Sequence, residues 1–364
     1  MTVQHPPSPF PRLTRRELVA LGGAAAFLGL PICAESQGLQ DTLQGDWRDK
    51  TADVNGSKIH YVEKGSGPLV LLCHGFPEGW YSWRHQIDAI ANAGYQVVAP
   101  DLRGYGRTGG PDAVEAYTIK ELVSDVTGLL DALDTPQCVL VGHDFGAVLT
   151  WNAALLAPER FKALVAMSVP YNPRGSTPPV AGIRRAVGGN FNYIVYFQEP
   201  GVAERELESD VAAFLRAFYF SASAEGVDDL RRVPTRSRFA KMMETLVDPK
   251  RLPSWLSADD FRYYVGEFTR NGLARPLNWY RNLDTNWSLM QAYDGAKITH
   301  PTLFVAGEVD PVLLNTKRNF DRLASTVPGL VKTALIPDAG HWVQQEQPTQ
   351  VNAQLIAFLK QVHR

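Results

Sequence analysis

Cysteine is scarce in this sequence, with three residues among 364. Two of them, Cys73 and Cys138, adjoin apolar runs that we predict as neighbouring parallel strands, one at the end of its run and the other at the start. This placement puts a disulfide between them out of reach. No pair of cysteines or histidines has metal-ligand spacing. The sequence therefore predicts neither a disulfide scaffold nor a metal centre.

A strong charge of either sign is also absent, because 36 Lys and Arg face 38 Asp and Glu. The basic residues are spread along the chain, so no patch for binding phosphates is evident and nucleic acid is not expected as a partner. No segment reaches the roughly 18 continuous apolar residues that a membrane-crossing helix needs. We therefore expect no membrane span in the mature chain, and the oligomeric state stays open.

The first 34 residues differ in composition from the rest. The paired Arg15 and Arg16 precede an apolar, Ala- and Gly-rich run over residues 20–32, which Cys33-Ala34 and a polar stretch follow. This order is typical of a twin-arginine export signal. We predict a signal peptide over residues 1–34, with its cleavage point open, and a periplasmic or extracellular protein. The alternative is a tail with two chance arginines.

Beyond this segment, short apolar runs alternate with amphipathic stretches. Continuous Val, Leu and Ile runs indicate a sheet covered on both faces, and the β–α alternation indicates a parallel, doubly wound α/β fold. Between residues 170 and 300 the alternation stops and the sequence turns aromatic and helical. We predict a core domain of residues 48–169 and 301–364 with an inserted helical cap domain over residues 170–300. The predicted strands are 59–62, 69–73, 97–99, 139–141, 164–167, 303–306 and 333–336, and the main helices are 83–93, 119–133, 147–157 and 349–362.

A Gly-x-Asp-x-Gly motif at residues 142–146 lies between a predicted strand and a predicted helix. This is the context of a nucleophile elbow, with Asp144 where many hydrolases carry serine. The flanking glycines suit a strained turn that lifts Asp144 above the sheet. Taken alone, the motif is equally compatible with an aspartate that caps a helix.

Two further residues follow predicted strands in the order that a catalytic triad requires. Asp310 comes shortly after the 303–306 strand and His341 after the 333–336 strand, which gives nucleophile, acid and base in chain order. All three lie at carboxyl ends of strands, where open α/β sheets place their sites. Asp310 is expected to hold His341 in one tautomer. Glu308, two residues earlier, is the competing candidate for the acid.

Several motifs together resemble the epoxide hydrolases of the α/β-hydrolase fold. The resemblance lies in the His-Gly-Phe-Pro-Glu run at residues 74–78, Asp-Leu-Arg-Gly-Tyr-Gly at 101–106, the elbow, and Gly-His-Trp at 340–342. It extends into the cap at residues 196–201 and 277–282, and it covers roughly residues 50–362. The resemblance implies the fold, with a mostly parallel sheet and a helical cap.

The same resemblance implies the role of each site residue. Asp144 is expected to be the nucleophile, His341 the base, Asp310 its orienting acid, and Tyr196 and Tyr280 the proton donors. The backbone amides of Phe76 and Phe145 would form an oxyanion hole, with a cis bond before Pro77. Phe145 departs from many relatives, which carry Trp there, so pocket shape and substrate size are the properties least well predicted.

The chemistry of an aspartate nucleophile also points to an alkyl electrophile. Attack on an ester or amide would give an unfavourable mixed anhydride, whereas attack on an sp³ carbon gives an ordinary ester. Water activated by His341 can hydrolyse that ester, so no cofactor is needed. We therefore predict an epoxide hydrolase that makes a vicinal diol through a covalent ester on Asp144.

Two alternatives remain open at this stage. A haloalkane or haloacetate dehalogenase uses the same nucleophile, but a halide needs N–H donors such as an indole beside it, and Phe145 has none. An opening epoxide needs a proton, which a phenol with a pKa of about 10 can give. The other alternative is a non-catalytic ligand-binding protein on the same fold, which would be expected to carry a broken triad.

Overall fold

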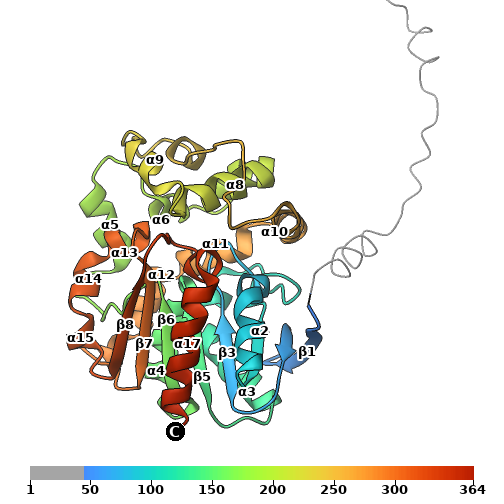
Figure 1. The fold of residues 1–364 in the computed structure, drawn as a ribbon. Helices are drawn as coiled ribbons and strands as arrows, with labels where there is room; N and C mark the ends of the chain where they lie inside the picture. The colour runs from blue at the N-terminus through green and yellow to red at the C-terminus, as the bar shows by residue number, and fades with distance from the viewer. Residues whose placement is uncertain (1–44) are drawn as a thin grey trace, which may run out of the picture. The chain divides into compact units, whose positions relative to one another are not determined.

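The computed structural model describes residues 45–364. The predicted signal peptide, residues 1–34, lies outside the described residues. A single sheet of eight strands has the order β1-β2-β4-β3-β5-β6-β7-β8 (Figure 1). The strands are β1 Arg48–Val54, β2 Ser57–Lys64, β3 Leu69–Cys73, β4 Gln96–Pro100, β5 Cys138–His143, β6 Phe161–Met167, β7 Thr302–Gly307 and β8 Leu330–Ile336.

The sheet is parallel from β4 through β8 and antiparallel only where β2 joins β1 and β4. All seven predicted strands are present, which confirms the mostly parallel sheet. β1 was not predicted. Its sequence, Arg-Asp-Lys-Thr-Ala-Asp-Val, is polar and mostly exposed because β1 is an edge strand that pairs only with β2. Such a strand carries no apolar pattern to detect.

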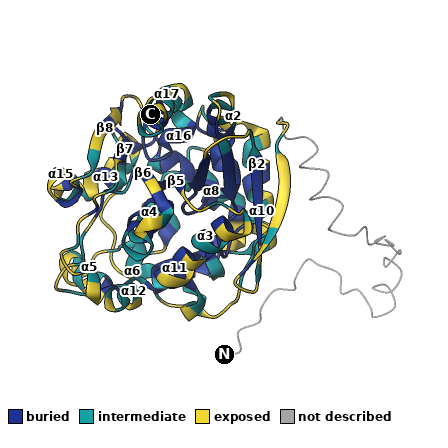
Figure 2. Cartoon of the chain, turned by 90° about the horizontal axis from the view of Figure 1, so that it is seen from below, coloured by how far each residue is buried: buried dark blue, intermediate teal, exposed yellow. Residues whose placement is uncertain are grey.

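Helices cover both faces of the sheet (Figure 2). One pair of packed helices, α2 and α17, lies on one face, and α3 and α4 pack together on the other. The interior strands are therefore buried on both sides, as their continuous apolar runs predict. The four predicted helices are confirmed to within two residues at their ends: α2 Arg84–Asn92, α3 Ile119–Ala132, α4 Phe145–Leu156 and α17 Pro348–Val362.

A helical insertion joins β6 to β7 and lies above the carboxyl ends of the strands (Figure 1). The predicted division into a core domain and a separate cap domain stays a prediction, because residues 45–364 form one unit. The main helices of the insertion are α5 Pro179–Val187, α6 Tyr193–Tyr196, α7 Val202–Leu207, α8 Val211–Ala222, α9 Val227–Arg232, α10 Ala258–Asn271, α11 Ala274–Arg281 and α12 Leu283–Leu289. The short helices α13 Pro311–Asn315, α14 Lys317–Asp321, α15 Leu323–Thr326 and α16 Val343–Glu346 complete the core.

The order of the strands explains where a site can form. β3 lies between β4 and β5, so the chain moves to opposite sides of β3 as it enters these two strands. At such a switch point the loops that leave the strands diverge and open a crevice at their carboxyl ends. The loops after β3 and β5 carry Phe76 and Asp144. Within residues 45–364, no helix has the length and apolar character to cross a membrane.

Candidate active site

Asp144 occupies a strained turn between β5 and α4. Its φ of 53° is uncommon for a residue with a side chain and is typical of strain retained at functional sites. The turn is possible only because glycines flank it. A Cβ on Gly142 would lie 2.0 Å from the carbonyl oxygen of Gly146, and one on Gly146 would lie 2.0 Å from that of Cys73.

The loop after β3 supplies the backbone around the Asp144 carboxylate. The amide of Phe76 donates a hydrogen bond of 3.0 Å to Oδ1 of Asp144. Phe145 is the first residue of α4, where amides lack an intrahelical partner. The Phe76–Pro77 peptide bond is cis, which confirms that prediction. The structure thus places both predicted oxyanion-hole residues beside Asp144.

The other two predicted triad residues lie on the same side of the sheet. His341 directs Nε2 to Asp144 Oδ2 at 3.5 Å, and its Nδ1 lies 3.2 Å from Asp310 Oδ1. Asp310 is fully buried and caps the start of α13, where its side chain also accepts a hydrogen bond from the Val312 amide. The competing candidate, Glu308, is exposed and makes no contact with the histidine among the hydrogen bonds of the described residues. The geometry therefore favours Asp310.

The side chains of Asp144, His341 and Asp310 stabilise one another's charged forms. Burial disfavours the charged form of His341, but the Asp310 carboxylate and the hydrogen bond to Asp144 raise its pKa well above the ordinary value. Burial likewise disfavours the Asp144 carboxylate, yet its hydrogen bond to His341 and the charge of that ring keep its pKa below the ordinary value. Asp144 is thus an anion, as a nucleophile must be.

A buried hydrogen-bond network connects the loop after β3, the end of β5 and the loop after β8. Glu78 accepts hydrogen bonds of 2.8 Å from the Gly75 amide and from Nδ1 of His143. The other ring nitrogen of His143 lies 2.8 Å from the backbone oxygen of His341. Glu78 and His143 therefore fix the loops that carry Phe76 and His341 without facing the reacting atoms.

A cavity of about 600 Å³ opens between the core and the helical insertion, above Asp144 and His341. Its walls are largely apolar, and the insertion contributes two phenols, Tyr193 and Tyr280. The Tyr280 ring lies 4.7 Å from the Phe145 ring and 6.0 Å from the Tyr193 ring, measured between centroids. Burial raises the pKa of both phenols and the nearby Asp144 carboxylate raises it further, so both stay protonated.

Tyr196, the other predicted proton donor, does not line this cavity. Its hydroxyl donates to Glu206, whose carboxylate also accepts from the backbone amides of Met242 and Met243. This contact ties α6 to a neighbouring part of the insertion and holds the phenol on Glu206, which is not one of the residues that line the cavity. The structure therefore does not place Tyr196 at the cavity, and Tyr193, three residues earlier, lines it instead.

The sequence indicates where α6 begins, but not which of its two tyrosines faces the cavity. Asn192 precedes it, and the Asn192 side chain caps α6 by accepting hydrogen bonds from the amides of Ile194 and Val195. The cap makes Tyr193 the first helical residue and Tyr196 the last. Ser168, which also contacts His341, was missed as well, because a single serine after a strand carries no motif.

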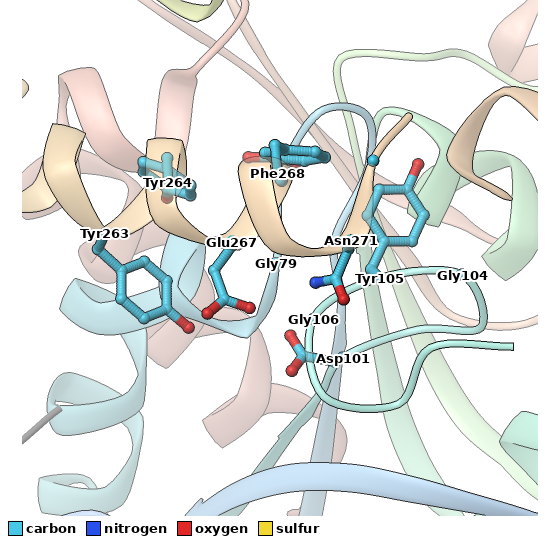
Figure 3. A pocket seen from close by; sticks show the side chains of 12 residues that line it. Gly79, Asp101, Gly104, Tyr105, Gly106, Tyr263, Tyr264, Glu267, Phe268 and Asn271 are labelled. Carbon is cyan, nitrogen blue, oxygen red and sulfur yellow. The ribbon is translucent and has the colours of Figure 1, made fainter. Parts of the chain in front are cut away.

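A much smaller cavity lies between α10 and the loop after β4 (Figure 3). Its volume of about 10 Å³ suits about one water molecule. Glu267 and Asn271 of α10 point toward Asp101 there, and burial raises the pKa of Glu267. This cavity contains neither Asp144 nor His341. Across residues 45–364, no three His, Cys, Asp or Glu side chains converge on a metal position.

Comparison with known proteins connects this geometry to a family. Residues 68–348 match the family model described as the alpha/beta hydrolase fold. The chain is 45% identical over 321 residues to a protein of Mycobacterium tuberculosis named epoxide hydrolase A, covering 85% of this chain and 97% of that protein.

Solved structures agree with the sequence match. An epoxide hydrolase from an endophytic Streptomyces superposes with a TM-score of 0.84 at 41% identity, covering 87% of this chain and 96% of that one. Epoxide hydrolase A from Mycobacterium thermoresistibile superposes with a TM-score of 0.82 at 45% identity, with 86% and 98% covered. The chain therefore belongs to the α/β-hydrolase fold family and, within it, to the epoxide hydrolases.

Proposed function

We propose that this epoxide hydrolase opens its substrate by attack of Asp144 and releases a vicinal diol by hydrolysis of the resulting ester, with residues 170–300 acting as a cap over the site. The observation that carries the proposal is the pairing of the Asp144 carboxylate with two phenols in one cavity. An anionic nucleophile faces one end of the substrate, and protonated hydroxyl groups face the oxygen that must leave.

In the first half-reaction, an Asp144 oxygen attacks one ring carbon and the carbon–oxygen bond of the epoxide breaks. The departing oxygen takes a proton from Tyr193 or Tyr280, since an unprotonated alkoxide would be a poor leaving group. The product is a hydroxyalkyl ester on Asp144. Both phenols are protonated at neutral pH, which suits them for this step.

In the second half-reaction, His341 takes a proton from water, and the resulting hydroxide attacks the acyl carbon of Asp144. Alkylation has by then removed the Asp144 charge that helps to raise the pKa of His341, so this pKa falls and the ring more readily adopts the neutral form that can take a proton from water. The amides of Phe76 and Phe145 stabilise the oxyanion. Water leaves its oxygen in the Asp144 carboxylate, and its two hydrogens go to the diol, directly or by reloading a tyrosine.

The cavity does not suit a halide as leaving group. No tryptophan is among the residues that line it. The indoles packed against Phe145 and His341 already donate elsewhere: Trp279 Nε1 to the Arg103 backbone oxygen at 3.0 Å, and Trp342 Nε1 to the Tyr219 backbone oxygen at 2.9 Å. Neither Phe145 nor its neighbours therefore offer the indole donor that a departing halide needs. This supports ring opening over dehalogenation.

A single turnover in ¹⁸O-labelled water tests the covalent route. Because water attacks the acyl carbon and not the substrate, we expect the label in the peptide that contains Asp144, while the diol stays unlabelled. Mass spectrometry of the digested protein and of the product measures both. The peptide that contains Asp310 is the internal control, and label in the diol alone would show direct attack by water on the epoxide.

We also propose that residues 1–34 direct export through the twin-arginine pathway, which moves folded proteins. The two cysteines that follow this segment, Cys73 and Cys138, are buried and free, so the enzyme needs no disulfide formed outside the cell. This suits export of a chain that is already folded.

The variant Arg15→Lys/Arg16→Lys tests export. We expect an active enzyme that stays inside the cell, because the pathway reads the arginine pair. Fractionation with an activity assay measures its location, and Arg12→Lys, which leaves the pair intact, is the matched control. Normal export of the double variant would refute the proposal.

A further inference from the structure

Ser168 lies directly after β6, at the carboxyl end of the sheet, and is completely buried. Its hydroxyl donates a hydrogen bond of 2.5 Å to Oδ2 of Asp310. The same oxygen lies 2.8 Å from Nδ1 of His341. Ser168 therefore contacts both the acid and the base of the triad, from a strand that carries neither of them.

The number of protons decides the direction of these bonds. A serine hydroxyl has one hydrogen, and Ser168 gives it to Asp310, so its oxygen must accept from Nδ1–H of His341. The Nδ1 atom lies closer to Ser168 Oγ, at 2.8 Å, than to either oxygen of Asp310, at 3.2 and 3.4 Å. With Nδ1 as the donor, the neutral ring carries its lone pair on Nε2, which faces Asp144.

The backbone of Ser168 is held in an unfavourable conformation. Its φ of 71° is in the left-handed region, where a residue with a side chain is strained and glycine is not. Its amide donates 2.9 Å to the Val305 oxygen of β7, which anchors the residue beside the strand that leads to Asp310. A buried serine in a backbone conformation that favours glycine indicates that the hydroxyl group of Ser168 has a role in the site.

We propose that Ser168 is a positioning residue for ester hydrolysis. Its hydroxyl links the Asp310 carboxylate to Nδ1 of His341 through two hydrogen bonds. These bonds fix the tautomer whose Nε2 accepts a proton from water, and they orient the ring toward Asp144. The proposal depends on the two-step function proposed above. Because only the second half-reaction uses His341 as a base, Ser168 acts on hydrolysis and not on ring opening.

The variants Ser168→Ala and Ser168→Gly test this role together. Both variants remove the hydroxyl. The glycine variant also relieves the strain at positive φ, so it tests the role even if the alanine variant fails to fold. We expect hydrolysis of the ester to slow by about 10- to 100-fold in both, the effect of losing a hydrogen bond to a charged group. Ester formation should stay within about two-fold of the parent rate. Single-turnover kinetics on the fraction of enzyme that forms ester separates the two rates.

Two controls make the result specific. Ser82 is a completely buried serine that bonds to the Tyr264 hydroxyl, and Ser82→Ala should change neither rate. In a His341→Gln background, Ser168→Ala should add little, because residues that act through one another are not additive.

If ester hydrolysis slows in Ser168→Ala but not in Ser168→Gly, Ser168 has only a packing role and the proposed positioning role is wrong. Equal loss in both half-reactions, or no loss in either variant, would also overturn it. The two-step function is tested separately, by whether His341→Gln accumulates ester. Its failure can therefore be distinguished from failure of the Ser168 proposal.

Discussion

Replacement of His341 by glutamine is expected to convert the enzyme into one that captures its substrate. Asp144 keeps its carboxylate and the phenols keep their protons, so the ester forms. Glutamine cannot take a proton from water, and hydrolysis should slow by about 10²–10⁴, the usual contribution of a general base. Intact-mass spectrometry after mixing with an epoxide measures the result, as a mass increase equal to one substrate.

The matched control for this variant is His85→Gln. His85 is exposed on α2 and outside the cavity, so its replacement should leave turnover unchanged and no adduct detectable. A His341→Gln enzyme that forms no adduct with an epoxide turned over by the parent would contradict the assigned roles. A mass increase that persists in Asp144→Asn would place the ester on another residue.

The interior of the sheet could be predicted because its strands are buried on both faces. Runs such as Leu69–Cys73 and Cys138–His143 must then be apolar throughout, and such runs are visible without a structure. β1 escaped prediction for the opposite reason. Its edge position leaves most of Arg48–Val54 in water, and its pairing with β2 depends on backbone hydrogen bonds rather than on apolar side chains.

The residues brought together on the core side of the site could likewise be predicted, because strand ends fix them. Asp144, Asp310 and His341 each follow a parallel strand, and the topology brings those ends to one edge of the sheet. The orientation of a cap tyrosine has no such constraint. Tyr193 and Tyr196 lie in one short helix, and which of them faces Asp144 depends on the contact between Tyr196 and Glu206, ten residues further along the chain.

Ser168 shows a further limit of prediction from sequence. Its role arises where β6, the Asp310 loop and the His341 loop converge, and these segments are separated by 142 and 173 residues from Ser168. No local pattern encodes such a meeting. Its positive φ, which marks the position in the structure, is equally invisible in a residue type that is common in loops.

Removal of both cavity phenols in Tyr193→Phe/Tyr280→Phe is expected to block ring opening. Each phenol faces the cavity above Asp144, so either can donate to the departing oxygen, and each single variant should retain part of the activity. With both hydroxyls gone, the alkoxide would form unprotonated. Alkylation should then slow by about 10²–10⁴, while hydrolysis of an ester already formed should hardly change. Stopped-flow or rapid-quench measurement of the two half-reactions shows this asymmetry.

Tyr196→Phe is the matched control, because it removes a phenol from the same helix. Its hydroxyl binds Glu206 outside the cavity, so the variant can lose stability but should keep the rate of alkylation per folded molecule. Slow alkylation in Tyr196→Phe together with a normal rate in Tyr193→Phe would restore the original assignment from sequence. Full epoxide turnover in the double variant would return both cavity tyrosines to a packing role, and activity on a haloalkane panel would then decide whether a halide is the leaving group.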